Sequence, residues 1–352
     1  MDMMQTLLLE LLFMAGSTIG LGKERPVVGA IRWDAWTGGA VTEQVERTLG
    51  PRQYHNRLPW FAEVVDDTTV KIDGRPQKIM DREIEMAAAA GLDYWAFLVY
   101  RKNHPMSVAL EQYLKSRKRD RIRFCLILHS SLTVPEKLWP AERDRAVALL
   151  QEPGYQVVLG DRPLVYAFAG NEFPFERFEE FLAAARRKGL KPYCVYMGWN
   201  PASDFSRVNP KGFDAVSAYA RNGNQADFTN LVKTVEEDYW NNALQAKVPY
   251  VPLVTTGWDK NPRIDNPVSW EKESAYHSQE VFPGRAEPRE IAAHLQAALA
   301  FVDEHPDVCP ARAVIIYAWN EYDEGGWLAP TRGDDGRPDT TRLNAIRAVL
   351  KR

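Results

Sequence analysis

The segment YAWNEYDEGGWLAP, residues 317–330, places two carboxylic acids three positions apart at the end of an apolar run. Glu321 and Glu324 are flanked by Trp319 and Trp327, and two glycines follow the second glutamate directly. Cleavage of a glycosidic bond needs a protonated carboxylic acid and a second carboxylate that acts as base or nucleophile. An apolar pocket can make one of two such acids weaker, so that the pair divides these roles near neutral pH.

The pair also has a simpler interpretation, because two glutamates at this spacing are usually solvated residues on one face of a helix. A β-rich run precedes this pair and two glycines follow it, which weakens the simpler interpretation. The glycines would also let the backbone approach a ligand closely. We therefore treat Glu321 and Glu324 as candidate catalytic residues.

Short β-rich runs alternate with amphipathic helical stretches from residue 27 onward. Several runs are apolar at successive positions, which is typical of strands covered on both faces in a parallel sheet. The predicted strands are residues 27–33, 93–100, 122–128, 163–168, 191–197, 213–219, 248–256 and 311–319. Eight strands separated by helices predict an α/β fold, a single (β/α)8 TIM barrel that forms a catalytic domain over residues 27–352.

The connections between these strands are mostly helical. Helices are expected at roughly 77–90, 105–118, 141–152, 174–188, 226–246, 287–304 and 340–351. The crossover after the fifth strand leaves space only for a short helix or none. Long βα loops are predicted after strand 1, roughly residues 34–76, and after strand 7, and such loops are usually functional or mobile. The alternative fold, an open doubly wound sheet, lacks a glycine fingerprint after its first strand.

The carboxyl ends of barrel strands are where substrate-binding residues gather. The candidates there are Trp33, Asp34, Tyr100, His129, Trp258, Asp259, Trp319, Asn320 and Trp327. Structural alternatives stay open for several of them. Asp259 and Arg263 could form an ion pair that holds the seventh loop. Trp33 and Trp258 could be buried packing at the rim, and His129 could be a hydrogen-bonded rim residue.

The composition limits the classes of function. The 352 residues carry a formal net charge of −3 without the basic patch or stripe of a nucleic-acid binder. Three cysteines are too few for a disulfide framework, and the six histidines show no metal-ligand spacing. A Walker loop, a complete G-x-G-x-x-G and a G-x-S-x-G elbow do not occur in the sequence, which argues against nucleotide-dependent and serine-hydrolase chemistry.

The first 26 residues read as a separate N-terminal segment. Their apolar centre followed by small residues resembles a degenerate export signal, although Asp2 replaces the positive start and Glu10 interrupts the apolar run. The segment is too short and too interrupted to span a bilayer. A secreted or periplasmic location is therefore expected, and a cytoplasmic one if residues 1–26 instead form an amphipathic helix.

Several motifs together resemble a known family. AWNEYDEGGWLAP resembles the A-W-N-E-W-x-E-G-x-x-L-E-P signature of the WbsX-like family, which is similar to glycoside hydrolase family 99. TTGWDKNPR, residues 255–263, resembles the P-x-W-D-N-x-P-R segment of that family, and residues 79–100 resemble its second-strand unit. The similarity extends over about residues 28–350.

The resemblance implies a (β/α)8 barrel with no metal or organic cofactor, acting on a carbohydrate substrate. It implies a retaining α-glycosidase in which Glu321 deprotonates the 2-hydroxyl of the sugar and Glu324 is the general acid/base at the glycosidic oxygen. No partner protein is implied.

The sequence departs from the family pattern at several points. Ala329 replaces a glutamate, LILHSS at 126–131 replaces a W-A-N-E-type segment, and RWDAWTGG differs from the usual end of the first strand. The sugar is therefore left open. Two other functions also stay open: a glycosyltransferase of polysaccharide biosynthesis, which is disfavoured because the chain has no D-x-D, and a non-catalytic carbohydrate-binding protein on a hydrolase scaffold.

Overall fold

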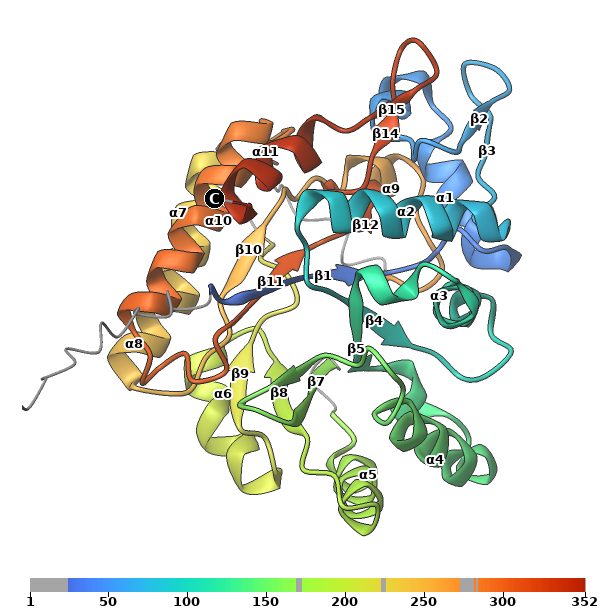
Figure 1. The fold of residues 1–352 in the computed structure, drawn as a ribbon. Coiled ribbons are helices and arrows are strands. Elements are labelled where there is room, and N and C mark those ends of the chain that lie inside the picture. The colour runs from blue at the N-terminus through green and yellow to red at the C-terminus, as the bar shows by residue number, and fades with distance from the viewer. Residues whose placement is uncertain (1–24, 169–172, 223–225, 273–281, 283, 352) are drawn as a thin grey trace, which may run out of the picture.

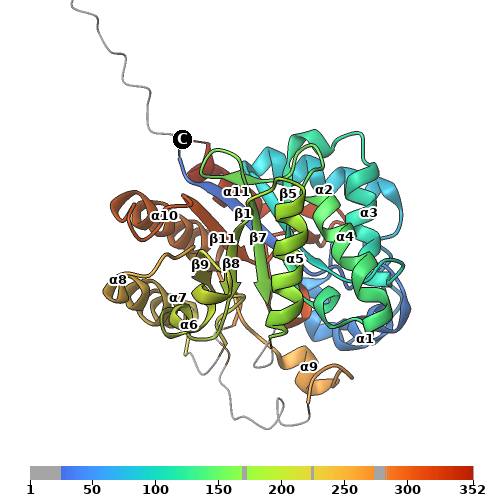
Figure 2. The ribbon, with the colours of Figure 1, turned by 90° about the horizontal axis from the view of Figure 1, so that it is seen from below.

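The protein is described by a computed structural model over residues 25–351, apart from 169–172, 223–225, 273–281 and 283. A ring of parallel strands lies at its centre and helices surround the ring (Figures 1 and 2). The ring strands are β1 (Val27–Arg32), β4 (Tyr94–Val99), β5 (Arg123–Leu128), β7 (Arg162–Phe168), β8 (Tyr193–Met197), β9 (Ala215–Ser217), β10 (Leu253–Thr255) and β11 (Ala313–Tyr317). Each matches one of the eight predicted strands.

The strand order shows that the sheet is a barrel. Paired neighbours run β10-β11-β1-β4-β5-β7-β8-β9, and the short strand β6 (Val157–Val158) adds to β7. The seam between β9 and β10 is bridged just before β10, where Val216 pairs with Tyr250 and the Val251 amide donates to the Val216 carbonyl at 3.0 Å. The predicted (β/α)8 barrel is therefore confirmed, and the open doubly wound alternative is wrong.

The interior of the barrel is filled by side chains, as the apolar strand runs require. Gly29 on β1 pairs with Tyr94 on β4, and a Cβ atom at Gly29 would lie 2.2 Å from the tyrosine ring. The Tyr94 hydroxyl lies 2.8 Å from that of Tyr166 and donates to the Val314 carbonyl at 3.0 Å. Because no space is left inside, a ligand must bind at an end of the barrel.

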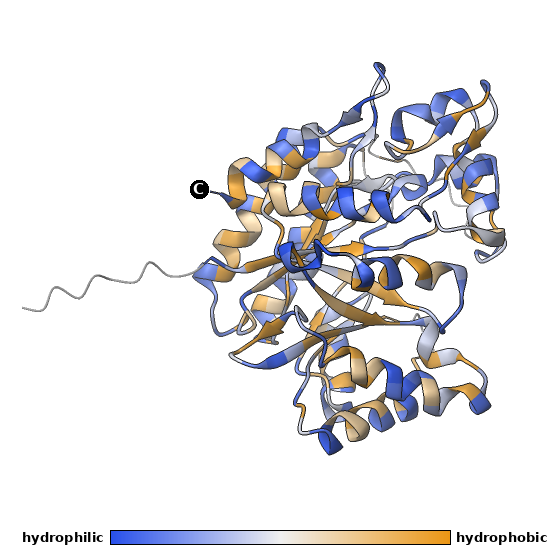
Figure 3. Cartoon of the chain, turned by 45° about the vertical axis from the view of Figure 1, so that its right-hand side comes forward, coloured by the Kyte–Doolittle hydropathy of each residue, from blue (hydrophilic) through white to orange (hydrophobic). Residues whose placement is uncertain are grey.

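The surrounding helices follow the predicted pattern closely. They are α2 (Gln77–Ala90), α3 (Val108–Lys115), α4 (Trp139–Leu149), α5 (Phe175–Arg187), α6 (Pro201–Val208), α7 (Phe228–Val235), α8 (Asn242–Ala246), α10 (Pro288–Glu304) and α11 (Thr341–Leu350). Figure 3 shows the hydrophobic strands in the centre and mixed, amphipathic helices outside. The fifth crossover holds only the eight-residue α6, in line with the short helix expected there.

Long segments follow β1, β10 and β11. The first contains α1 (Gly39–Leu49), the 3₁₀ helix η1 (Arg52–Arg57) and a hairpin of β2 (Glu63–Val64) and β3 (Val70–Lys71). The second contains α9 (Asn261–Asp265). The third contains β12 (Asn320–Glu321), the 3₁₀ helix η9 (Tyr322–Glu324), β13 (Gly326–Trp327), β14 (Thr331–Arg332) and β15 (Pro338–Asp339). Figure 1 shows these pieces gathered at one side of the barrel.

The N-terminal segment is almost entirely outside the described residues, which begin at Arg25. The export signal therefore stays a prediction, as does the cellular location. Among the described helices, none combines the length and the apolar character needed to cross a membrane.

Candidate active site

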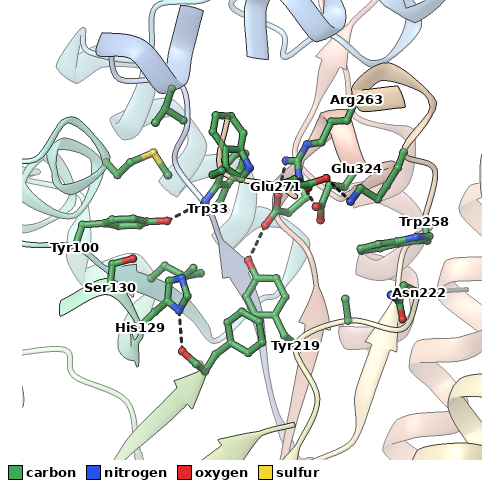
Figure 4. Close-up of a pocket in the computed structure, with 18 of the residues that line it drawn as sticks. Trp33, Tyr100, His129, Ser130, Tyr219, Asn222, Trp258, Arg263, Glu271 and Glu324 are labelled. Atoms are coloured by element: carbon green, nitrogen blue, oxygen red, sulfur yellow. Dashed lines mark hydrogen bonds and ion pairs between the residues drawn. The ribbon is translucent and has the colours of Figure 1, made fainter. Parts of the chain in front are cut away.

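A cavity of about 900 Å³ opens where the segments after the strands meet (Figure 4). It is lined by Trp33, Val41, Leu98, Tyr100, His104, Met106, His129, Ser130, Phe168, Trp199, Tyr219, Ala220, Asn222, Trp258, Lys260, Arg263, Trp270, Glu271, Lys272, Glu321 and Glu324. Both candidate catalytic glutamates are in this wall. Its volume is that of a typical site for a small molecule or a short oligomer.

The glycines after the glutamates shape the turn that carries them. Gly325 has φ +84°, and a Cβ atom there would lie 2.5 Å from the backbone nitrogen of Asp259. A Cβ atom on Gly326 would lie 2.3 Å from the ring of Tyr317. The sequence suggested that these glycines let the backbone approach a ligand. In the structure they let it approach the segment after β10 and the end of strand β11.

Glu321 is buried in the wall of the cavity. Its Oε1 accepts a hydrogen bond of 2.6 Å from the Tyr219 hydroxyl, and its Oε2 lies 4.0 Å from Nη2 of Arg263. Burial and then the negative charge of Glu324 raise the pKa of Glu321 well above its ordinary value, while Arg263 and the Tyr219 hydrogen bond oppose this rise. Glu321 is therefore the carboxyl group of the pair that favours holding a proton.

Glu324 is held differently from Glu321. Its Oε1 pairs with Nη1 of Arg263, and its Oε2 accepts a hydrogen bond of 2.6 Å from the Tyr317 hydroxyl. Both oxygens thus already accept from donors. Because Arg263 approaches both glutamates, the two carboxyl groups face the same guanidinium, and both residues line the same cavity. Figure 4 shows Glu324 beside Arg263.

Arg263, on α9, is also bound by two acids outside the candidate pair. Asp323, which has no exposed surface, meets its Nε at 2.7 Å and its Nη2 at 3.1 Å. Glu271 meets its Nη1 at 2.6 Å and also pairs with Lys260. The Asp259–Arg263 ion pair considered from the sequence is therefore not formed, because Arg263 pairs with these acids and with Glu324 instead.

Aromatic side chains form the other walls of the cavity. Trp33 donates its Nε1 hydrogen to the Tyr100 hydroxyl at 3.0 Å. Nδ1 of His129 donates to the Phe168 carbonyl at 2.8 Å, since a carbonyl can only accept. Burial lowers the pKa of His129, so the neutral ring presents its other nitrogen as an acceptor. Trp33, Tyr100, His129 and the buried Trp258 all line the cavity, as the sequence predicted of substrate-binding residues.

Two predicted binding residues, Asp34 and Asp259, instead form buried ion pairs with arginines. Asp34 meets Arg32 at 2.6 Å and does not line the cavity. Asp259 meets Arg57 at 2.6 Å and does not line it either. A carboxylate at these buried positions needs a cationic partner, which the neighbouring arginine supplies.

Three more predicted binding residues lie behind the wall. Asn320 accepts from the Trp33 amide at 2.9 Å and donates to Asp34 at 3.0 Å, so it fastens the end of β1 to the segment after β11. Trp319 has no exposed surface, and Trp327 lies under the Arg342 guanidinium at 3.9 Å from its ring centre. These side chains position the segment that carries Glu321 and do not line the cavity.

Several residues that line the cavity or contact the glutamates were not predicted. Tyr219 lies at the end of the predicted strand 213–219 but was not among the predicted binding residues, although its position could have indicated such a role. Tyr317 lies inside the last strand, where its hydroxyl gave no signal of a partner. Glu271 and Trp270 lie in the long loop after β10, whose path the sequence does not reveal. Among the described residues, no group of three His, Cys, Asp or Glu is arranged to hold a metal ion.

Comparison with solved structures finds the same fold in a glycoside hydrolase. Two structures of the family 99 endo-α-mannosidase of Bacteroides thetaiotaomicron, one in complex with bis-tris propane, match with TM-scores of 0.54 and 0.53. Each match covers 92% of this chain and 96% or 95% of the other, at 10% sequence identity. The predicted resemblance to family 99 is thus confirmed at the level of the fold. Neither protein-family models nor curated proteins match the sequence.

Proposed function

We propose that this protein is a glycoside hydrolase that cleaves an α-glycosidic linkage in a polysaccharide or glycan. The observation that carries the proposal is the placement of Glu321 and Glu324, two shielded carboxyl groups that line one cavity and face one arginine. The aromatic rings around them suit the apolar faces of sugars. The fold shared with the family 99 endo-α-mannosidase supports the same class of reaction.

The chemistry follows from the unequal surroundings of the two acids. Hydrolysis with retention needs one group that gives a proton to the leaving oxygen and one that activates the other side of the sugar. A buried pair that shares a single proton supplies both. The family resemblance assigns the proton transfer to the leaving oxygen to Glu324 and the deprotonation of the 2-hydroxyl to Glu321.

In the free site, the surroundings of the two acids favour the proton on the other member of the pair. Tyr317 and Arg263 both donate to Glu324, whereas the raised pKa of Glu321 favours its protonated form. If Glu324 is the acid, substrate binding must therefore first separate it from Arg263 or move the proton across the pair. If Glu321 is the acid, no such step is needed.

The activity is tested with a panel of α-linked polysaccharides and glycans, on which reducing ends released by the wild-type protein are compared with those released by Glu324→Gln. We expect hydrolysis of at least one polymer by the wild type and its loss in the variant, with folding intact. Binding without turnover across the panel would contradict the proposal and indicate a carbohydrate-binding protein.

The division of roles is tested with aryl α-glycosides of the sugar that the panel identifies. A good leaving group needs no protonation, so the variant that lacks the acid keeps activity on activated aryl glycosides while losing it on the polymer. Glu321→Gln and Glu324→Gln are compared side by side. Rescue of the Glu324 variant alone supports the family assignment, and rescue of the Glu321 variant alone reverses it.

A further inference from the structure

Asp323 stands between the two candidate catalytic glutamates, yet its side chain is turned away from the cavity. It is completely buried and binds two nitrogens of Arg263 at 2.7 and 3.1 Å. This two-point contact fixes the plane of the guanidinium from behind. Asp323 and Glu324 are neighbours on the 3₁₀ helix η9, so both contacts to Arg263 come from one short element.

Two neighbouring tryptophan rings also lie against the guanidinium. Its central carbon lies 5.2 Å from the Trp33 ring centre and 5.6 Å from that of Trp270. Rings at this distance attract the cation and limit its rotation. With Nε and Nη2 turned to Asp323, the free edge at Nη1 is directed to Glu324 and Glu271. Glu321 stays at 4.0 Å from Nη2, beyond hydrogen-bonding distance.

We propose that Arg263, anchored by Asp323, is a positioning residue that makes the two glutamates unequal: it binds Glu324 directly and leaves the shared proton to Glu321. In its bearing on catalysis, the inference rests on the proposed function. The statement about where the proton lies in the free protein does not depend on the proposed function.

Among the residues that the structure describes, the acids that face Arg263 come from two segments. Glu321, Asp323 and Glu324 come from the segment after β11, and Glu271, which also holds Lys260, comes from the loop after α9. The hydroxyls that face the pair are those of Tyr219, at the end of β9, and Tyr317, on β11.

The two members of the anchor have opposite electrostatic effects on the pair. The positive charge of Arg263 lowers the pKa of Glu321, and the negative charge of Asp323 raises it. Removing Arg263 must therefore shift the titration of the pair to higher pH, and removing the charge of Asp323 must shift it to lower pH. Loss of packing alone would not produce opposite signs.

The test uses Arg263→Gln, Asp323→Asn and the double variant. The pH dependence of kcat/KM reports the titrating groups of the free enzyme. We expect its alkaline limb, where the pair loses the proton held by Glu321, to move up by about one pH unit in Arg263→Gln and down by a similar amount in Asp323→Asn, as for a charge within a few ångströms. The double variant, which removes one charge of each sign, returns toward the wild-type profile.

The matched control is the Arg57–Asp259 ion pair, which is as short and nearly as buried but whose side chains do not line the cavity. Asp259→Asn should lower stability without moving the profile. A second readout needs no activity: the infrared carbonyl band of protonated glutamate in protein labelled with ¹³C-glutamate, assigned to Glu321 by its loss in Glu321→Gln. Its midpoint should shift in the same two directions.

The outcomes separate this inference from the proposed function. If the infrared band shifts with opposite signs while no glycan is cleaved, the function fails and the inference holds. If glycans are cleaved but Arg263→Gln and Asp323→Asn shift both readouts in the same direction, or no more than Asp259→Asn does, the inference is overturned.

Discussion

Two buried arginines, Arg32 and Arg263, organise acids in different parts of the molecule. Arg32 meets Asp34 at 2.6 Å and Glu83 at 2.9 Å, with its guanidinium 4.3 Å from the Trp95 ring centre. Arg263 meets Asp323, Glu271 and Glu324 and lies beside two neighbouring tryptophan rings. The guanidinium of each is almost completely shielded from solvent.

Each cluster also contains a glutamate with a raised pKa. Burial raises the pKa of Glu83 beside Arg32, and burial raises that of Glu321 beside Arg263. The difference is access, because Arg263 and three of its acids, Glu271, Glu321 and Glu324, line the cavity whereas none of the Arg32 cluster does. A shifted pKa therefore does not by itself mark a reactive group here, and contact with the cavity is what separates the two clusters.

The largest effect on stability is expected from the cluster of Arg32, Asp34, Glu83 and Trp95, called the sealed cluster here because none of its side chains lines the cavity. Arg32→Met leaves Asp34 and Glu83 without their cation, and breaking a buried ion pair in this way costs about 3–5 kcal/mol. Hydrolysis per folded molecule should stay unchanged, since Arg32 does not line the cavity. Urea unfolding gives the first quantity, and turnover corrected for the folded fraction gives the second. A stable Arg32→Met protein without activity would contradict the comparison.

The pH dependence of stability distinguishes a glutamate with a raised pKa from an ordinary one. The pKa of Glu321 is raised above 4.5 by folding, so its stabilising contribution is complete below that pH and is lost as pH rises through the folded-state pKa. Relative to Glu321→Gln, the wild type should lose up to about 1.4 kcal/mol of unfolding free energy per pH unit in that window. Urea unfolding of both proteins between pH 5 and 8 measures this.

Glu83→Gln is the companion measurement in the sealed cluster. The pKa of Glu83 is also raised by burial, so the difference from wild type should have the same sign. A difference in unfolding free energy that does not change with pH, or that changes in the opposite direction, would show that these carboxyl groups are charged in the folded protein.

The smallest effect is expected from the exposed aromatic rings. Trp199 and Trp270 line the cavity yet are 38% and 39% exposed, unlike the buried Trp95 of the sealed cluster. Alanine at either position should weaken glycan binding by roughly 1 kcal/mol, or about fivefold. Calorimetric titration of the inactive Glu324→Gln background measures this. Unchanged affinity in both variants would show that neither ring contacts the ligand.

The barrel could be predicted from the sequence because its signals are local. Each strand, such as DYWAFLVY at 93–100, is a continuous apolar run, and each helix repeats apolar residues at the helical period. The glutamate pair could be predicted as well, because it directly follows the last strand. Helix α1 was not predicted within the first loop, since its pattern is interrupted by polar residues.

The partners of the glutamates could not be predicted, because they depend on pairings between distant segments. Arg263 and Asp323 are 60 positions apart, and Tyr219 and Glu321 are 102 apart. Asp34 and Asp259 follow strand ends, where substrate-binding residues are expected. Each instead forms a buried ion pair with an arginine that the sequence pattern did not link to it. Which carboxylate faces a cavity and which is neutralised behind it is decided by tertiary packing.

The central claim is that Glu321 and Glu324 act as one unit on a glycosidic bond. The most direct measurement is kcat/KM of Glu321→Gln, Glu324→Gln and the double variant on the polymer that the wild type cleaves. Each single variant should fall at least about 10²-fold, and the double variant should fall little further, because groups that act together are not additive. Single variants that hydrolyse the polymer at nearly the wild-type rate would contradict the claim.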